Sequence, residues 1–178
     1  MTTIKLLGIS GALRQGSTNR LLLKEAARLA GDVAYSEADL NLPLYDGDDE
    51  EKDGVPAAAL ALAKQIAEAD AIVIATPEYN AGVTGVLKNA LDWVSRVEGN
   101  PWDGKPVTVV SAAAGRSGGV QAQAMLRDCM TAFAPRLVIG PPVAVAASYE
   151  EFDENGQLKG EVYVSNLTAL MSKLRAAV

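Results

Sequence analysis

A run of hydroxyl, glycine and basic residues near the N-terminus has the side-chain types that bind a phosphate group. The run lies between a short apolar segment, Ile4–Ile9, and a segment in which apolar residues recur at helical spacing from Leu22 onward. Its members are Ser10, Gly11, Arg14, Gly16, Ser17, Thr18 and Asn19. Hydroxyls, the N–H groups of a helix N-terminus and a guanidinium fork all favour a phosphate. A plainer interpretation, in which the serines only cap the helix, fits the same residues.

Two familiar phosphate-binding patterns can be compared with this stretch. The glycines at positions 8, 11 and 16 do not match the dinucleotide pattern G-x-G-x-x-G. The nucleotide-hydrolase pattern G-x-x-x-x-G-K-[ST] fits from Gly11 to Thr18, except that Ser17 stands at the lysine position. Because that lysine contacts the β- and γ-phosphates, we expect a loop that holds a phosphate without hydrolysing it.

The composition narrows the possible chemistry. The chain has 178 residues, and we expect one domain, residues 1–178. A net charge of −6 argues against nucleic acid as a partner, and the absence of histidine excludes a Ser-His-Asp triad and the usual zinc ligands. The single cysteine, Cys129, is expected to be a small buried residue. With no visible signal peptide and no apolar run long enough to span a membrane, we expect a cytoplasmic protein.

Strand and helix patterns alternate along the chain. The expected strands are Ile4–Ile9, Val33–Leu40, Asp70–Thr76, Val107–Ala112 and Leu137–Val145, the last interrupted by Pro141 and Pro142. The expected helices are Thr18–Ala30, Val55–Ala69, Val83–Val97, Gln121–Phe133 and Ser165–Ala177, with Asn41–Asp53 as a loop. This alternation predicts an α/β fold: a flavodoxin-like three-layer sandwich with a five-stranded parallel sheet of order 2-1-3-4-5 and helices on both faces.

Two further polar, glycine-bearing loops, Pro77–Gly85 and Ala113–Val120, follow the third and fourth expected strands. In the order 2-1-3-4-5 the first, third and fourth strands are neighbours. Ligands of such sheets bind outside the carboxyl ends of the strands. The three loops are therefore expected to converge on one crevice.

Three motifs resemble those of the NAD(P)H-dependent FMN reductases and their quinone- and chromate-reducing relatives. GISGALRQGSTN, starting at Gly8, is similar to the family loop G-S-L-R-x-G-S-x-N. PEYNAGVTGVLKNALDW, starting at Pro77, resembles P-E-Y-N-x-S-x-P-G-x-L-K-N-A-x-D-W, and AAGRSGG, starting at Ala113, resembles the family's third, glycine-rich loop. The likeness covers nearly the whole chain. Two departures are Ala12, where the family usually has serine, and Thr84, where it usually has proline.

The resemblance implies specific roles for residues of all three loops. It puts the FMN phosphate on Ser10, Arg14, Ser17 and Asn19, with Thr18 beside them, and the isoalloxazine ring on Pro77, Glu78, Tyr79, Asn80, Ser111 and Gly115. Taken alone, Glu78 reads equally well as a solvated acid and Tyr79 as a packed loop aromatic. Arg116 is a candidate for a phosphate of NADPH or an ordinary surface arginine. Lys88, Asn89 and Trp93 lie on a helix and are expected to be structural or interfacial.

The resemblance implies an oxidoreductase in which bound FMN takes a hydride from NAD(P)H. Electrons would then pass to a quinone, free flavin, azo dye or metal-ion acceptor by a ping-pong scheme. No catalytic side chain is expected, because the flavin carries the chemistry. A homodimer or homotetramer is also implied. Two alternatives remain open on the sequence: an FMN-holding electron carrier without nicotinamide turnover, and a nucleotide- or phosphosugar-binding protein that uses only the first loop.

Overall fold

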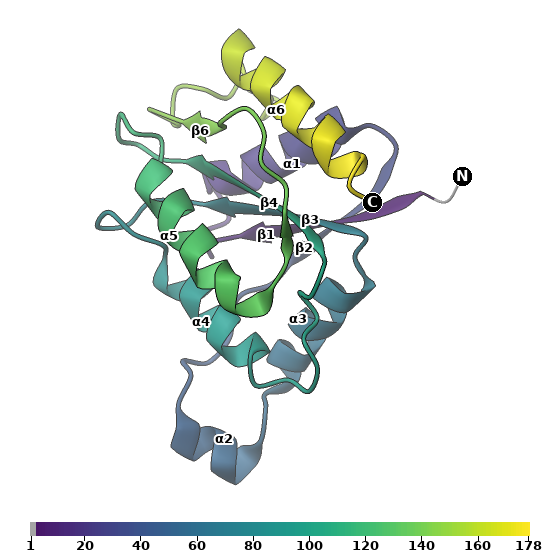
Figure 1. Ribbon diagram of the computed structural model, residues 1–178. Helices are drawn as coiled ribbons and strands as arrows, with labels where there is room; N and C mark the ends of the chain where they lie inside the picture. The colour runs from purple at the N-terminus through teal and green to yellow at the C-terminus, as the bar shows by residue number, and fades with distance from the viewer. Residues whose placement is uncertain (1–2) are drawn as a thin grey trace.

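A parallel β-sheet forms the middle layer of the molecule (Figure 1). A computed structural model describes residues 3–178. The main strands are β1 (Ile4–Ser10), β2 (Val33–Ala38), β3 (Ala71–Thr76) and β4 (Pro106–Ala112). Every residue of β3 and β4 is buried, as expected for central strands covered on both faces. The observed order β2-β1-β3-β4-β5 confirms the predicted sheet.

The fifth strand position is filled by two short pieces, β5 (Arg136–Leu137) and β6 (Ala144–Val145). Both pair in parallel with β4, one near its start and the other at its end. Pro141 and Pro142 lie between them and lack the N–H group that a ladder requires. The hydroxyl of Thr108 donates to the carbonyl of Val138 (3.0 Å) within this interruption. The predicted break is confirmed.

Helices cover both faces of the sheet. On one face lie α1 (Thr18–Ala30) and α6 (Glu161–Arg175), and on the other lie α3 (Ala57–Glu68), α4 (Gly85–Val94) and α5 (Val120–Met130) (Figure 1). Two separate hydrophobic cores result. The core beside α1 and α6 includes Leu22, Val73, Val110 and Leu170, and the other includes Ile9, Ile72, Leu91 and Leu126.

Several predicted boundaries differ from those of the structure. The segment Asn41–Asp53 is not entirely a loop, because Gly47–Asp53 forms the short helix α2. Asp46 caps it by accepting a hydrogen bond from the N–H group of Asp48, and three acids occupy its first turn, where the helix dipole favours them. The last helix begins at Glu161, four residues before the predicted Ser165, directly after Gly160. A 3₁₀ turn, η1 (Thr131–Phe133), ends the predicted helix Gln121–Phe133.

The chain before α2 is fastened to α4. The carbonyl of Pro43 accepts hydrogen bonds from the Asn89 amide (2.9 Å) and the Trp93 indole N–H (2.7 Å). The Asn89 side-chain oxygen accepts from the N–H group of Tyr45 (2.8 Å), and the Tyr45 ring meets Trp93 edge-on. The structural role predicted for Asn89 and Trp93 is therefore confirmed.

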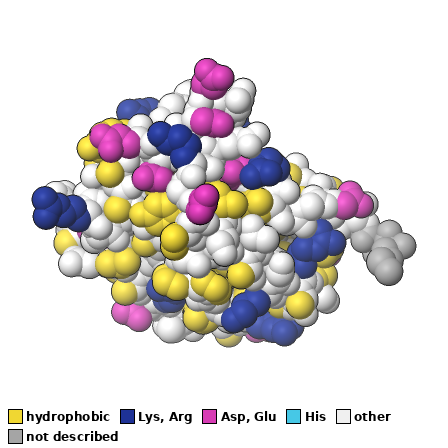
Figure 2. Space-filling model, turned by 90° about the horizontal axis from the view of Figure 1, so that it is seen from above, with side chains coloured by type: hydrophobic (Ala, Val, Ile, Leu, Met, Phe, Trp, Pro, Cys, Tyr) yellow, Lys and Arg dark blue, Asp and Glu magenta, His cyan; other side chains and the backbone are white. Residues whose placement is uncertain are grey.

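The surface over α6 carries mixed charges. Figure 2, seen from above, shows Lys and Arg side chains separated by acidic and hydrophobic ones, so the described part of this face has no continuous basic surface. Among the described helices, none combines the length and hydrophobicity that crossing a bilayer requires.

Candidate functional site

Three loops lie at the carboxyl edge of the sheet, where the arrows of β1, β3 and β4 end (Figure 1). They span residues 11–17, 77–84 and 113–119. The first two loops are joined directly. The N–H group of Gly11 donates to the carbonyl of Ala75 (2.8 Å), and the hydroxyl of Thr84 donates to the carbonyl of Gly11 (2.7 Å). Thr84, which stands where the family usually has proline, also caps α4: its hydroxyl accepts a hydrogen bond from the N–H group of Leu87.

The first loop exposes residues 13–16 directly before the start of α1. Ser17 caps α1, and its hydroxyl accepts from the N–H group of Asn19 (3.2 Å). Within the described residues, the N–H groups of positions 13–16 have no protein acceptor. A Cβ atom at Gly16 would meet no other atom within 4 Å, so the backbone here borders open space. The exposed Arg14 guanidinium donates to the carbonyl of Gly16 (3.1 Å).

Ser10 and Asn19, both expected at the phosphate, are buried and form hydrogen bonds with the backbone. Ser10 is buried, and its hydroxyl donates to the carbonyl of Ala12 and accepts from that residue's N–H group. Asn19 is 1% exposed, and its side chain forms hydrogen bonds with both backbone groups of Ala112 at the end of β4 (2.8 and 3.0 Å). These two residues therefore shape the loop and tie α1 to the sheet.

The second loop is a tight turn that projects an aromatic ring. Tyr79 and Gly82 exchange both backbone hydrogen bonds, at 3.2 and 3.1 Å. The two central residues, Asn80 and Ala81, have φ angles of 51° and 62°, which defines a type I′ turn. Pro77 is buried, whereas Tyr79 is 56% exposed. An alanine in this conformation costs about 1 kcal/mol, so the turn shape is held by its surroundings.

The half-buried Glu78 reaches the start of α5. Its Oε2 atom accepts from the N–H groups of Gln121 (3.0 Å) and Ala122 (3.3 Å), and its Oε1 atom accepts from the hydroxyl of Ser117 (3.4 Å). Glu78 is thus a partner of the third loop, which the sequence did not indicate.

A buried hydrogen-bond network fixes the third loop. The hydroxyl of Ser111 donates to the carbonyl of Gly118 (2.6 Å) and accepts from the amide of Gln123 (2.7 Å). Gln123 also donates to the carbonyl of Val143 and accepts from the half-buried Arg127, whose pKa is lowered by burial. Ser111 is fully buried, so its side chain supports the loop from behind. Gly115 and Arg116 are exposed at the loop's tip.

A fourth segment, which the sequence did not predict, reaches the same edge of the sheet. After β6, the N–H group of Ser148 donates to the carbonyl of Ala113 (3.1 Å), and the hydroxyls of Ser148 and Thr18 lie 3.0 Å apart. Ala147 has a φ of 42°, another strained turn position. No spacing in the sequence links Ser148 to Thr18, because the two residues are 130 positions apart.

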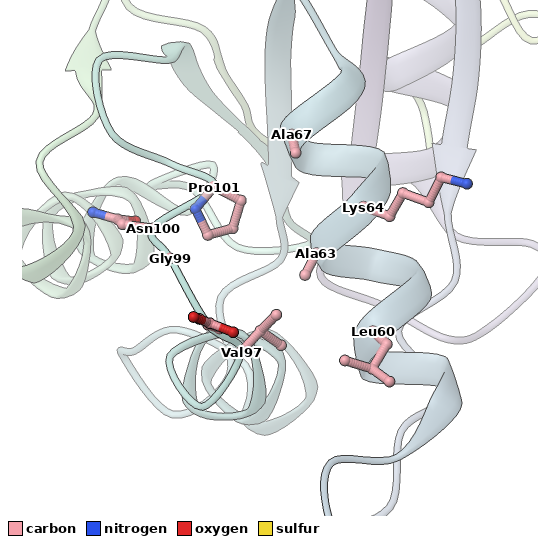
Figure 3. Close-up of a pocket in the computed structure, with 9 residues that line it drawn as sticks. Leu60, Ala63, Lys64, Ala67, Val97, Gly99, Asn100 and Pro101 are labelled. Carbon is pink, nitrogen blue, oxygen red and sulfur yellow. The ribbon is translucent and has the colours of Figure 1, made fainter.

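These features fit FMN. Unpaired N–H groups, hydroxyls and a guanidinium at the start of α1 match a phosphate, and the exposed turn with Tyr79 offers an apolar wall for a planar ring. Asn80 supplies this turn with a side-chain amide, which can both donate and accept. A separate hollow of about 360 Å³ lies elsewhere, between α3 and the turn after α4 (Figure 3). It is lined mainly by apolar residues, including Leu60, Val97 and Pro101, and shares no residue with the three loops.

The fold and the three edge loops define a flavodoxin-like protein, and comparison with known proteins agrees. The family model described as NADPH-dependent FMN reductase matches residues 4–151, so the chain belongs to this family. An NAD(P)H-dependent FMN reductase of Pseudomonas aeruginosa is 41% identical over 157 residues, covering 87% of this chain and 84% of that protein. A quinone reductase of Escherichia coli K12 is 38% identical over 142 residues, covering 78% of this chain and 75% of that protein.

A solved structure extends the likeness to the whole chain. FerB, a flavoenzyme NAD(P)H:(acceptor) oxidoreductase from Paracoccus denitrificans, has a TM-score of 0.85 at 28% identity, with 98% of both chains covered. The predicted family, the enzyme class of oxidoreductase, and FMN with NAD(P)H as the cofactors of that family are confirmed.

Proposed function

We propose that this protein binds FMN across the three carboxyl-edge loops and reduces a small-molecule acceptor at the expense of NAD(P)H. Bound there, FMN would accept a hydride from the nicotinamide and pass electrons to a quinone, free flavin, azo dye or metal-ion acceptor. The observation that carries the proposal is the juxtaposition, on one sheet edge, of the open α1 N-terminus and the turn bearing exposed Tyr79.

Residues of the first loop would hold the phosphate. Arg14 is exposed and forms no ion pair within the described residues, so its guanidinium is available to an anion. Ser17 and Thr18 place hydroxyls at the helix start, where the dipole favours negative charge. Ser10 and Asn19 would not contact the phosphate themselves but would keep the loop and helix α1 in place.

Residues of the second and third loops would orient the ring. The Asn80 amide suits the carbonyl and imide edge of the isoalloxazine, with Pro77 and Tyr79 beside it. Gly115 would let the backbone of the third loop approach closely, because no side chain intervenes. Backbone N–H groups near the ring would stabilise negative charge that develops on reduction.

No side chain need serve as a general acid or base. The chain contains no histidine, and the exposed rim of the crevice leaves protons available from water. One open ring face would serve NAD(P)H and the acceptor in turn, which is the physical basis for a ping-pong order.

Initial-rate kinetics test this order. We expect the FMN-loaded protein to oxidise NADPH with a benzoquinone, giving parallel lines in double-reciprocal plots at several fixed quinone concentrations. Lines that intersect would contradict the shared site, and no oxidation with quinone, free flavin, azo dye or ferric chelate would contradict the proposed reaction.

Three broader proposals accompany this function. We propose that residues 1–178 form a single domain, supported by two cores that share one sheet. We also propose a homodimer or homotetramer, for which Leu44, 82% exposed beside α4, supplies an apolar contact. A cytoplasmic location is proposed because the lone Cys129 has no disulfide partner.

A further inference from the structure

Helix α5 begins without a cap of its own. The residue at its N-cap position is Gly119, in a left-handed conformation with φ 96°, and it supplies no side chain. The N–H groups of the second and third helical residues, Gln121 and Ala122, are those that a capping side chain normally satisfies. Both donate to Glu78, which lies 43 residues earlier in the sequence than Gln121.

We propose that Glu78 is a positioning residue that joins the second and third loops and thereby forms the ring-binding part of the crevice. This inference rests on the proposed function, since it concerns how the same crevice is built. The neighbouring residues Pro77 and Tyr79 begin the projecting turn, and Ser117 belongs to the third loop. One carboxylate therefore contacts the loop after β4 and the helix that follows it.

The chemistry of this contact explains why an acid suits position 78. A carboxylate at a helix N-terminus is stabilised by the helix dipole and by charge-assisted hydrogen bonds. Glu78 accepts hydrogen bonds from α5 and from Ser117, so the role assigned to it here is to position these elements. The helix end that it covers would otherwise present free N–H groups to anions entering the crevice.

Two ligands can separate the contribution of the ring site to flavin affinity from the contribution of the phosphate site. Riboflavin lacks the phosphate, so its affinity for the apoprotein reports on the ring site alone, whereas FMN reports on both sites. Flavin fluorescence quenching would measure both dissociation constants for the wild type and for E78A, E78Q and E161A. Glu161 is a matched control because it also lies in the first turn of a helix, α6, but its side chain forms no hydrogen bond with either loop within residues 3–178.

We expect E78A to weaken riboflavin and FMN by the same factor, about tenfold, because two cap hydrogen bonds are lost. E78Q keeps one acceptor oxygen and should lose less, while E161A should bind both flavins as the wild type does. Hydrogen exchange at the amides of Gln121 and Ala122 should follow the same order, fastest in E78A.

Two results would overturn the inference. One is that E78A binds riboflavin as tightly as the wild type does. The other is that E78A loses affinity for FMN but not for riboflavin. If E78A does not fold, E78Q provides the test. Faster exchange at Gln121 and Ala122 in E78Q, together with unchanged riboflavin affinity, would show that the cap does not shape the ring site and would contradict the inference. Failure of the wild type to bind FMN would instead contradict the proposed function.

Discussion

Asn19 shows how a residue of a ligand loop can serve the fold. Its amide donates to the carbonyl of Ala112 and accepts from that residue's N–H group, which fastens α1 to the end of β4. The sequence motif indicates that an asparagine belongs here, but it does not tell whether the amide faces a ligand or the backbone. Only the fold brings position 19 beside position 112.

Replacing Asn19 with alanine should destabilise the protein by about 2–4 kcal/mol, because two buried backbone groups of Ala112 lose their partners. Urea unfolding of the apoprotein measures this. Asn41→Ala is the matched control, since Asn41 is exposed and its side chain has no hydrogen bond within the described residues; it should change stability by less than about 0.5 kcal/mol. Equal effects of the two substitutions would contradict the role given to Asn19.

At the scale of elements, the third loop depends on the close approach of Gly118 to the backbone of β6. A Cβ atom at Gly118 would lie 2.3 Å from the carbonyl oxygen of Ala144, at a φ of 62°. Gly104 has a similar φ of 64°, but a Cβ atom there would meet nothing within 4 Å. Alanine substitutions at these two positions therefore separate the cost of the steric clash from the cost of the positive φ angle.

We expect Gly118→Ala to destabilise the protein by about 2 kcal/mol more than Gly104→Ala, because only the first forces β6 away from the loop. Thermal unfolding of both variants gives the difference. If the two substitutions had the same cost, the loop and β6 would not be packed as described.

Helix α2 is held by charge rather than by a core. It has no buried residue, and its Glu50 accepts from the guanidinium of Arg96 (2.9 and 3.0 Å) and from the phenol of Tyr45 (3.0 Å). The hydrogen bond from Arg96 is the main cause that holds the pKa of Glu50 below its ordinary value. The same carboxylate raises the pKa of Tyr45.

A carboxyl group with a lowered pKa in the folded state stabilises that state above its ordinary pKa and loses the effect as the pH falls through the lowered value. Amide protection in residues 47–53 should therefore be present at neutral pH and lost as Glu50 is protonated in acid. In Glu50→Gln this pH dependence should be smaller than in the wild type, while the protection of β3 stays unchanged. Acid-independent protection of α2 in the wild type would contradict this account.

At the scale of the whole molecule, the sheet order and the placement of the three loops follow from the sequence because strand and helix patterns alternate regularly. The long apolar runs of β3 and β4 identify the central strands. Local capping also explains the misplaced boundaries: Asp46 starts α2 inside a segment whose acids suggested only a solvated loop. The contacts of Glu78 and Ser148 could not be predicted, because they join residues far apart in the chain.

The account's central claim is that the crevice at the carboxyl edge binds FMN and lets NAD(P)H reduce it. An anaerobic visible spectrum of the protein reconstituted with FMN, recorded before and after NADPH and then NADH, tests it most directly. We expect a bound-flavin band that differs from that of free FMN and bleaches on addition of at least one nucleotide. A band that persists with both nucleotides would contradict the reductase and favour an electron carrier, and a spectrum identical to that of free FMN would contradict the binding site itself.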